Sequence, residues 1–176
     1  MTALARDPLL SFALVVVRLI AILLAAAAIA TVIGMAFFAY DAATGSEVLA
    51  SEYPGSDPAV VSGHLWRLLP FAALGMACGA AFMHLLGKII ASAAERDPFD
   101  AINAQRLHRM AWLALAFQII AYPVRAAEAG LRAATEGGVI YADVGFGGFI
   151  IALVLFVLAR IFAHGADMRD DLEGTV

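Results

Sequence analysis

Four long apolar stretches constrain the fold of this chain more than any other feature of its sequence. They lie at about residues 19–38, 68–87, 110–125 and 144–163. A helix needs roughly 20 apolar residues to cross the hydrocarbon core of a bilayer, which is about 30 Å thick. The third stretch is the shortest, and the other three have the full length. We therefore expect an all-α protein with four transmembrane helices.

The composition supports the same class of protein. Hydrophobic residues make up 63% of the chain and charged residues only 15%, whereas soluble domains carry roughly 25% charged residues. The longest gap between the stretches, residues 40–66, is rich in Gly, Pro and Ser, which are typical of turns. No soluble domain fits there, so we expect residues 1–176 to form a single membrane domain, an integral membrane bundle.

The first stretch has two open questions. A cleaved signal peptide is an alternative, but the apolar run continues through Phe38, beyond a typical signal core of about 7–15 residues. We favour a retained span that begins at Leu19, because Arg18 then lies at the interface, where its side chain can reach water. A start at Pro8 would place this cation deep in hydrocarbon at high cost. Residues 8–17 then continue the helix into the cytoplasm or lie along the membrane.

The distribution of Lys and Arg predicts the orientation, because cytoplasmic loops carry an excess of them. One side of the predicted membrane has three arginines: Arg67, Arg125 and Arg132. The other side has eight Lys or Arg residues: Arg6, Arg18, Lys88, Arg96, Arg106, Arg109, Arg160 and Arg169. The richer side should be cytoplasmic. Both termini, the loop 88–109 and the tail 164–176 are then cytoplasmic.

A dense polar stretch, "ERDPFDAINAQRLHRMAW" at residues 95–112, interrupts the apolar sequence. Pro98 cannot continue a helix, and Asp100 is a good N-cap with Asn103 three residues later. One interpretation is a structural turn with Phe99 folded between two helices. The other is a docking site in which Phe99 anchors a cytoplasmic partner. The candidate residues in either case are Asp97, Pro98, Phe99, Asp100, Asn103, Arg106 and Arg109.

The C-terminal tail supplies charges that complement this loop. The loop 88–109 has a net charge of +1, and the segment from Arg160 to the C-terminus has a net charge of −2. Opposite charges attract, so we expect the tail to lie against the loop. Arg106 is expected to contact an acid of the tail: Asp167, Asp170 or Asp171.

The remaining polar residues give little support to chemistry. No Asp or Glu lies inside the four stretches, although coupled carriers usually keep an ionisable group there. The four histidines have no metal-binding spacing. Gln118, in the third stretch, is expected to make an interhelical hydrogen bond, and Gly75 and Gly79 are expected to pack helices closely. A net charge of −4 argues against direct nucleic-acid binding. We expect no catalytic residue, metal site or cofactor.

Two segments resemble a known family. "DPFDAINAQRLHRMAW" and "ARIFAHGADMRDDLEGTV" are similar to the bacterial membrane family called Domain of Unknown Function 2975. Ala101 departs from the family, which often has Pro there. The matching positions are Pro98, Phe99, Asn103, Ala104, Arg106, Leu107, Phe162, Gly165, Thr175 and Val176.

The resemblance implies a four-helix protein of the bacterial cytoplasmic (inner) membrane with no established activity. It also implies a partnership with small helix-turn-helix regulators, which are often encoded beside family members. The leading hypothesis is therefore a non-enzymatic protein that regulates or tethers a cytoplasmic regulatory protein. The alternatives are a small transporter or channel component, and a lipid-modifying membrane enzyme. The expected partners are the lipid bilayer and the regulatory protein, and the sequence leaves a homo-oligomer open.

Overall fold

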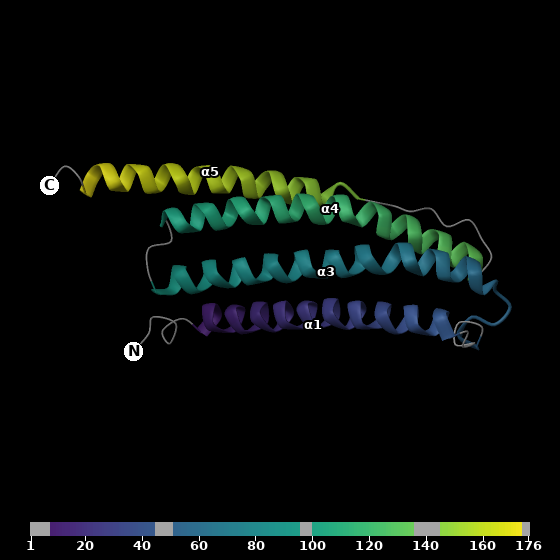
Figure 1. Ribbon diagram of the computed structural model, residues 1–176. Helices are drawn as coiled ribbons and strands as arrows, with labels where there is room; N and C mark the ends of the chain where they lie inside the picture. Colours follow the sequence, from purple (N-terminus) through teal and green to yellow (C-terminus); the bar gives the residue numbers. More distant parts are fainter. Residues whose placement is uncertain (1–7, 45–50, 96–99, 136–144, 174–176) are drawn as a thin grey trace. The chain divides into compact units, whose positions relative to one another are not determined.

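A computed structural model describes residues 8–44, 51–95, 100–135 and 145–173, without the side chains of residues 42, 44, 94, 95 and 170–173. The described residues form four long α-helices and no strand (Figure 1). The helices are α1 (Pro8–Thr44), α3 (Pro58–Glu95), α4 (Ala101–Thr135) and α5 (Gly147–Glu173). The all-α prediction is confirmed.

Each of the four helices is long and apolar enough to cross a membrane, judged by length and composition. The helices also continue beyond the apolar stretches that predicted them. Residues 8–17 belong to the same helix as the first stretch, and Arg18 is exposed on it. The fourth stretch begins earlier than its helix, since α5 starts at Gly147 and residue 144 lies outside the described residues.

The starts of α3 and α4 follow from local sequence. Asp57 precedes α3, and its carboxylate Oδ1 accepts the Ala59 N–H at 2.9 Å, while Pro58 occupies the first helical position. Asp100 plays the same part for α4, where its Oδ1 accepts the Ile102 N–H at 3.0 Å. An aspartate before a helix satisfies an N–H that has no intrahelical acceptor, and proline at the first position loses no hydrogen bond. The expected N-cap at Asp100 is present.

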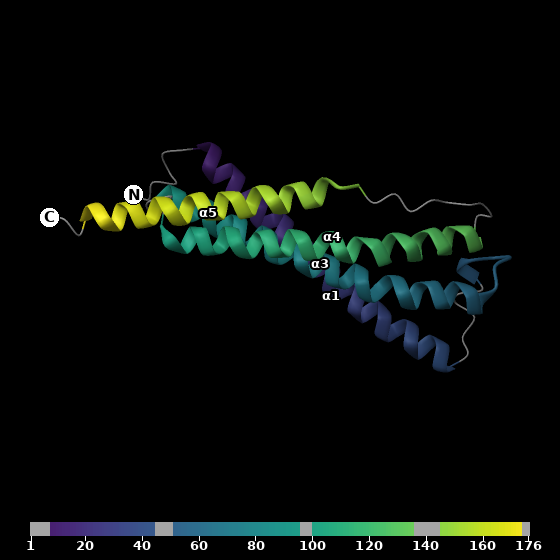
Figure 2. The same ribbon diagram turned by 90° about the horizontal axis from the view of Figure 1, so that it is seen from above.

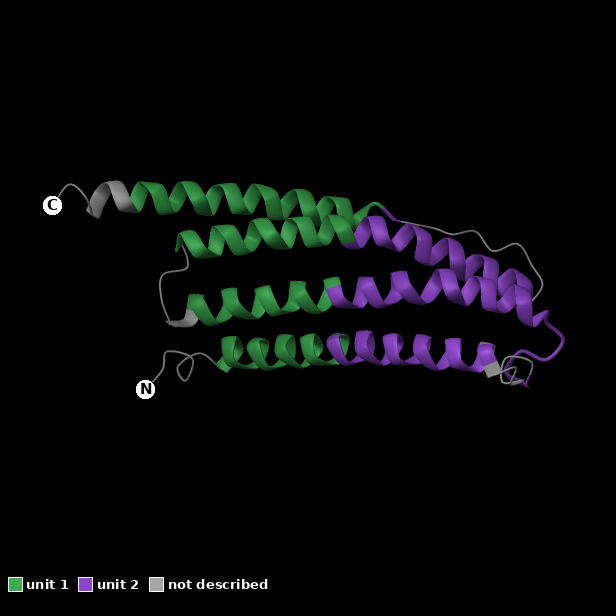
Figure 3. Ribbon diagram, in the orientation of Figure 1, with its two compact units in different colours: residues 1–24, 78–116, 146–176 green, residues 25–77, 117–145 purple. Residues whose placement is uncertain are grey.

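The helical chain divides into two compact units (Figure 3). Unit 1 comprises residues 1–24, 78–116 and 146–176, and unit 2 comprises residues 25–77 and 117–145. Unit 1 therefore holds α5 and parts of the other three helices, whereas unit 2 holds parts of α1, α3 and α4.

Small residues bring the helices of unit 1 together. A Cβ atom at Gly79 of α3 would lie 3.2 Å from Leu24 of α1, so the two helices approach closely there. In both views α5 runs beside the first part of α4 (Figures 1 and 2). The buried residues of these two helices include many alanines: Ala104, Ala111, Ala152, Ala159 and Ala166. Small side chains allow close helix packing in a membrane, where apolar side chains gain little by leaving lipid.

Unit 2 uses glycines in the same way. A Cβ atom at Gly75 would lie 3.7 Å from Ile120 and 3.8 Å from Phe117, both on α4. Farther along α4, Gly130 lies directly against the imidazole of His64. Gly75 and Gly79 thus both face neighbouring helices of this chain, as the Gly-x-x-x-Gly spacing predicts.

Large apolar side chains are exposed on all four helices. On α1 they lie on several sides of the helix, as Leu9, Ile29 and Val32 show with exposed fractions of 74%, 62% and 57%. Such a surface is unfavourable in water and favourable in lipid. The exposed apolar surface therefore agrees with helices that cross a membrane.

Candidate functional site

The predicted polar turn is described only from Asp100 onward. Asp97, Pro98 and Phe99 lie outside the described residues. The docking role of Phe99 and the alternative of a folded-back ring therefore stay predictions. Asp100 itself is half-buried and serves as the N-cap of α4.

Asn103 is the centre of a hydrogen-bonded cluster between α4 and α3. Its side chain is completely buried, and its Nδ2 donates to the Ser92 Oγ at 3.1 Å. Its Oδ1 accepts a hydrogen bond from Arg106 Nη1 at 2.9 Å. The same Arg106 nitrogen donates to the backbone carbonyl of Lys88 at 3.2 Å. These bonds fix the start of α4 to the end of α3, so Asn103 and Arg106 hold the two helices together.

Arg106 therefore finds its described partners on α3 and α4. Among the described residues no ion pair joins it to Asp167, which is exposed on α5. A shielded amide oxygen and a backbone carbonyl are strong acceptors for a guanidinium group, because less water competes for it there. The side chains of Asp170 and Asp171 lie outside the described residues, so their contact with Arg106 stays a prediction.

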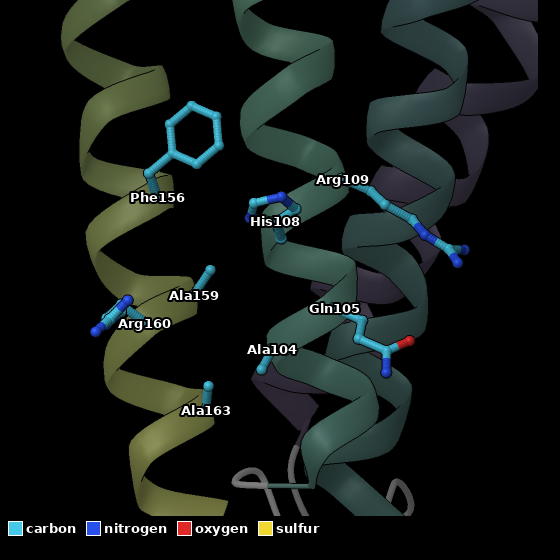
Figure 4. A pocket seen from close by; sticks show the side chains of 8 residues that line it. All are labelled: Ala104, Gln105, His108, Arg109, Phe156, Ala159, Arg160 and Ala163. Atoms are coloured by element: carbon cyan, nitrogen blue, oxygen red, sulfur yellow. The ribbon is translucent and has the colours of Figure 1, made fainter.

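Arg109 lies one turn beyond Arg106, and it borders a groove between α4 and α5 that the sequence did not indicate (Figure 4). We call this feature the α4/α5 groove. Its volume is about 590 Å³, and α4 and α5 line it in equal numbers: Ala104, Gln105, His108 and Arg109, with Phe156, Ala159, Arg160 and Ala163. Arg109, Arg160 and His108 are all exposed. The groove thus combines a floor of alanines with cationic and polar edges.

Three aromatic rings stand at one end of the α4/α5 groove. The Trp112 Nε1–H donates to the His108 Nε2 at 3.1 Å. The ring centroid of Phe156 lies 5.4 Å from that of His108 and 5.4 Å from that of Trp112, with edge-to-face geometry in both pairs. Since Nε2 accepts a hydrogen bond, the imidazole proton of neutral His108 is on Nδ1. His108 and Trp112 lie one turn apart on α4, whereas Phe156 comes from a distant part of the sequence, on α5.

Gln118 in unit 2 has a structural partner. Its side chain is buried, and its Nε2 donates to the backbone carbonyl of Gly145 at 2.7 Å. The carbonyl also belongs to unit 2, so this bond joins the middle of α4 to the last residue of that unit. The expected interhelical bond is replaced by a bond from α4 to a backbone carbonyl outside the helices.

In the described part of the chain no three His, Cys, Asp or Glu side chains come close enough to hold a metal ion. The polar groups that the structure does bring together are the Asn103 cluster and the edges of the α4/α5 groove. The polar groups of the Asn103 cluster form hydrogen bonds within the protein. Arg109, Arg160 and His108 at the groove edges are exposed.

No curated protein and no solved structure matches this chain. Residues 45–176, three quarters of the chain, match the family described as "Protein of unknown function (DUF2975)". The match begins directly after α1 and includes α3, α4 and α5 with the whole α4/α5 groove. The chain therefore belongs to the DUF2975 family of proteins of unknown function.

Proposed function

We propose that this protein is a non-enzymatic component of the bacterial cytoplasmic membrane that tethers a cytoplasmic regulatory protein. Both termini are cytoplasmic in this proposal, as the excess of Lys and Arg on that side predicts. The partner is a small helix-turn-helix regulator of the kind that the family resemblance implies. The bilayer is the other partner, and a homo-oligomer is compatible with the proposal.

The observation that carries the proposal is the helical extension of α5. The apolar stretch of α5 ends near Ala163, but the helix continues to Glu173. Ten further residues at 1.5 Å each extend the helix by about 15 Å. In Figures 1 and 2, α5 runs past the start of α4. Within unit 1 the extension is therefore a protruding helical segment.

The charge of this extension suits a basic partner. Between His164 and Glu173 it carries Asp167, Asp170, Asp171 and Glu173, with Arg169 as the only Lys or Arg. Proteins that bind DNA present a cationic surface, because they neutralise phosphates. An acidic helix at the membrane can attract such a surface and withhold it from DNA.

The cluster around Asn103 is a second observation that supports the proposal. Bonds from Asn103 and Arg106 to Ser92 and the Lys88 carbonyl fix the neighbouring helix ends. A docking surface on rigid elements loses less entropy on binding than one on a loose segment. The base of the α5 extension therefore stands beside a fixed pair of helices rather than beside a free loop.

Binding of a purified small helix-turn-helix regulator, of the kind often encoded beside members of the family, tests the proposal. The protein is placed in nanodiscs of zwitterionic lipid, so that the membrane itself attracts no cation. Replacing Asp167, Asp170 and Asp171 by Asn and Glu173 by Gln should weaken binding on the order of tenfold. Higher salt should weaken binding to the native protein, because it screens exposed charges.

The matched control removes two exposed acids from unit 2, by Glu52→Gln and Glu128→Gln. This variant should bind the regulator like the native protein. Equal binding to the native protein and to the variant without tail acids would contradict the tethering role of the tail. Absence of binding to the native protein would reject this partner class altogether.

A further inference from the structure

The α4/α5 groove is open because the side chains between the two helices are small. Ala104 and Ala159 are buried at its floor, with exposed fractions of 7% and 5%. Figure 4 shows Ala104, Ala159 and Ala163 facing the space between the two helices. None of these methyl groups is large enough to fill it, so a guest of about 590 Å³ has room.

Two arginines edge this space from opposite helices. Arg109 of α4 and Arg160 of α5 both line it and are exposed. Neither forms an ion pair within the described part of the chain. In Figure 4 the Arg109 guanidinium group points away from α5 and the Arg160 guanidinium group points away from α4, so neither covers the space between the two helices. Because both side chains are long and exposed, they can swing over a guest that carries negative charge.

Further hydrogen-bond donors are available beside these cations. Gln105 lines the same groove with an exposed amide. His108 Nε2 accepts the hydrogen bond from Trp112 Nε1–H, so in the neutral imidazole the second nitrogen, Nδ1, carries the hydrogen and is a donor. The nearest described acids lie beyond its ends: Asp100 caps α4 one turn before Ala104, and Asp167 follows Ala163 by one turn. The side chains that line the groove therefore include two cations and several hydrogen-bond donors, and no carboxylate.

The position of the groove along the helices defines the kind of guest. Arg109 directly precedes the apolar stretch of α4, and Arg160 lies near the end of the apolar stretch of α5. Trp112, which is 56% exposed, stands beside Phe156 at the apolar end. Arginine and tryptophan gather where hydrocarbon gives way to headgroups. The groove therefore reaches from headgroup depth into the apolar surface.

We propose that the α4/α5 groove binds one anionic phospholipid, with its phosphate between Arg109 and Arg160 and an acyl chain against Phe156 and Trp112. Basic pockets between transmembrane helices on the cytoplasmic side hold anionic headgroups in this way. A free phosphate ion would use the arginines but would leave the aromatic wall without a partner. The site is independent of the tether proposed above, which uses the acids of the α5 extension.

Quenching of Trp112 fluorescence by brominated lipids tests this site directly. The chain has two tryptophans, so Trp66→Phe leaves Trp112 as the only reporter. The protein is reconstituted in phosphatidylcholine vesicles that contain increasing amounts of brominated phosphatidylglycerol or brominated phosphatidylcholine. Phosphatidylglycerol should quench at about five- to tenfold lower mole fraction than phosphatidylcholine. The preference should disappear in the variant that combines Arg109→Gln and Arg160→Gln.

Three further variants complete the experiment. Arg67→Gln with Arg132→Gln removes two exposed arginines of unit 2 and should leave the preference unchanged. Arg109→Lys with Arg160→Lys keeps both charges and should retain most of it. Ala163→Leu fills the groove without changing charge and should remove it, which keeps the test valid if the glutamine variant does not insert.

Three results would overturn the proposal. The first is equal quenching of Trp112 by the two lipids in the Trp66→Phe protein. The second is a preference that survives both the glutamine variant and Ala163→Leu. The third is loss of the preference on adding millimolar inorganic phosphate, which would assign the groove to a soluble anion instead of a lipid.

Discussion

At the scale of single residues, Gly130 of α4 lies directly against His64 of α3 in unit 2. A Cβ atom at Gly130 would overlap the imidazole of His64. Gly130→Ala should therefore lower the free energy of unfolding by about 1–3 kcal/mol, as overpacking of a well-filled contact does. Unfolding of the detergent-solubilised protein in a denaturing detergent measures this change.

A double-mutant cycle separates the contact from helix propensity. His64→Ala should remove most of the penalty of Gly130→Ala, because the obstructing ring is gone. Gly63 of α3 is the control, since a Cβ atom there meets no other atom within 4 Å. Gly63→Ala should be neutral or stabilise by up to about 1 kcal/mol. A penalty at Gly63 as large as that at Gly130 would contradict the steric explanation.

At the scale of elements, the start of α4 is joined to the end of α3 through Asn103. Asn103→Ala removes the bonds to Ser92 and Arg106 and leaves both without this partner. Loss of buried hydrogen bonds costs about 1–3 kcal/mol, so this variant should unfold more easily by that amount. Gln105→Ala, an exposed neighbour on the same helix, should change stability little. Equal stability of the two variants would show that the cluster does not hold the helices together.

At the scale of the whole molecule, the excess of Lys and Arg predicts which helix ends are cytoplasmic. In a Cys78→Ala background, a cysteine at Glu52 should react with an impermeant maleimide in intact cells. A cysteine at Ala101 should react only after the membrane is opened. Both native side chains are exposed, whereas Ala104 is buried and would stay unreactive on either side. The reverse labelling pattern would invert the orientation and move the tail and the groove to the outer face.

The sequence by itself determined the class of fold and the local starts of helices. Apolar length and the polar gaps predicted four spans, and Asp100 was identified as an N-cap, because hydropathy and capping depend only on neighbouring residues. Two short segments, one around Asn103 and one around Gly165, also indicated the family, and the match over residues 45–176 confirms it.

Only the tertiary structure decided what these polar residues contact. Arg106 was expected to contact the tail, but its described bonds go to Asn103 and the Lys88 carbonyl. The α4/α5 groove needs Arg109 and Arg160, which are 51 positions apart. Helices that are apolar on several sides, as α1 is, carry little information about which face meets which neighbour. That choice depends on the packing of all four helices, and it created both the Asn103 cluster and the groove.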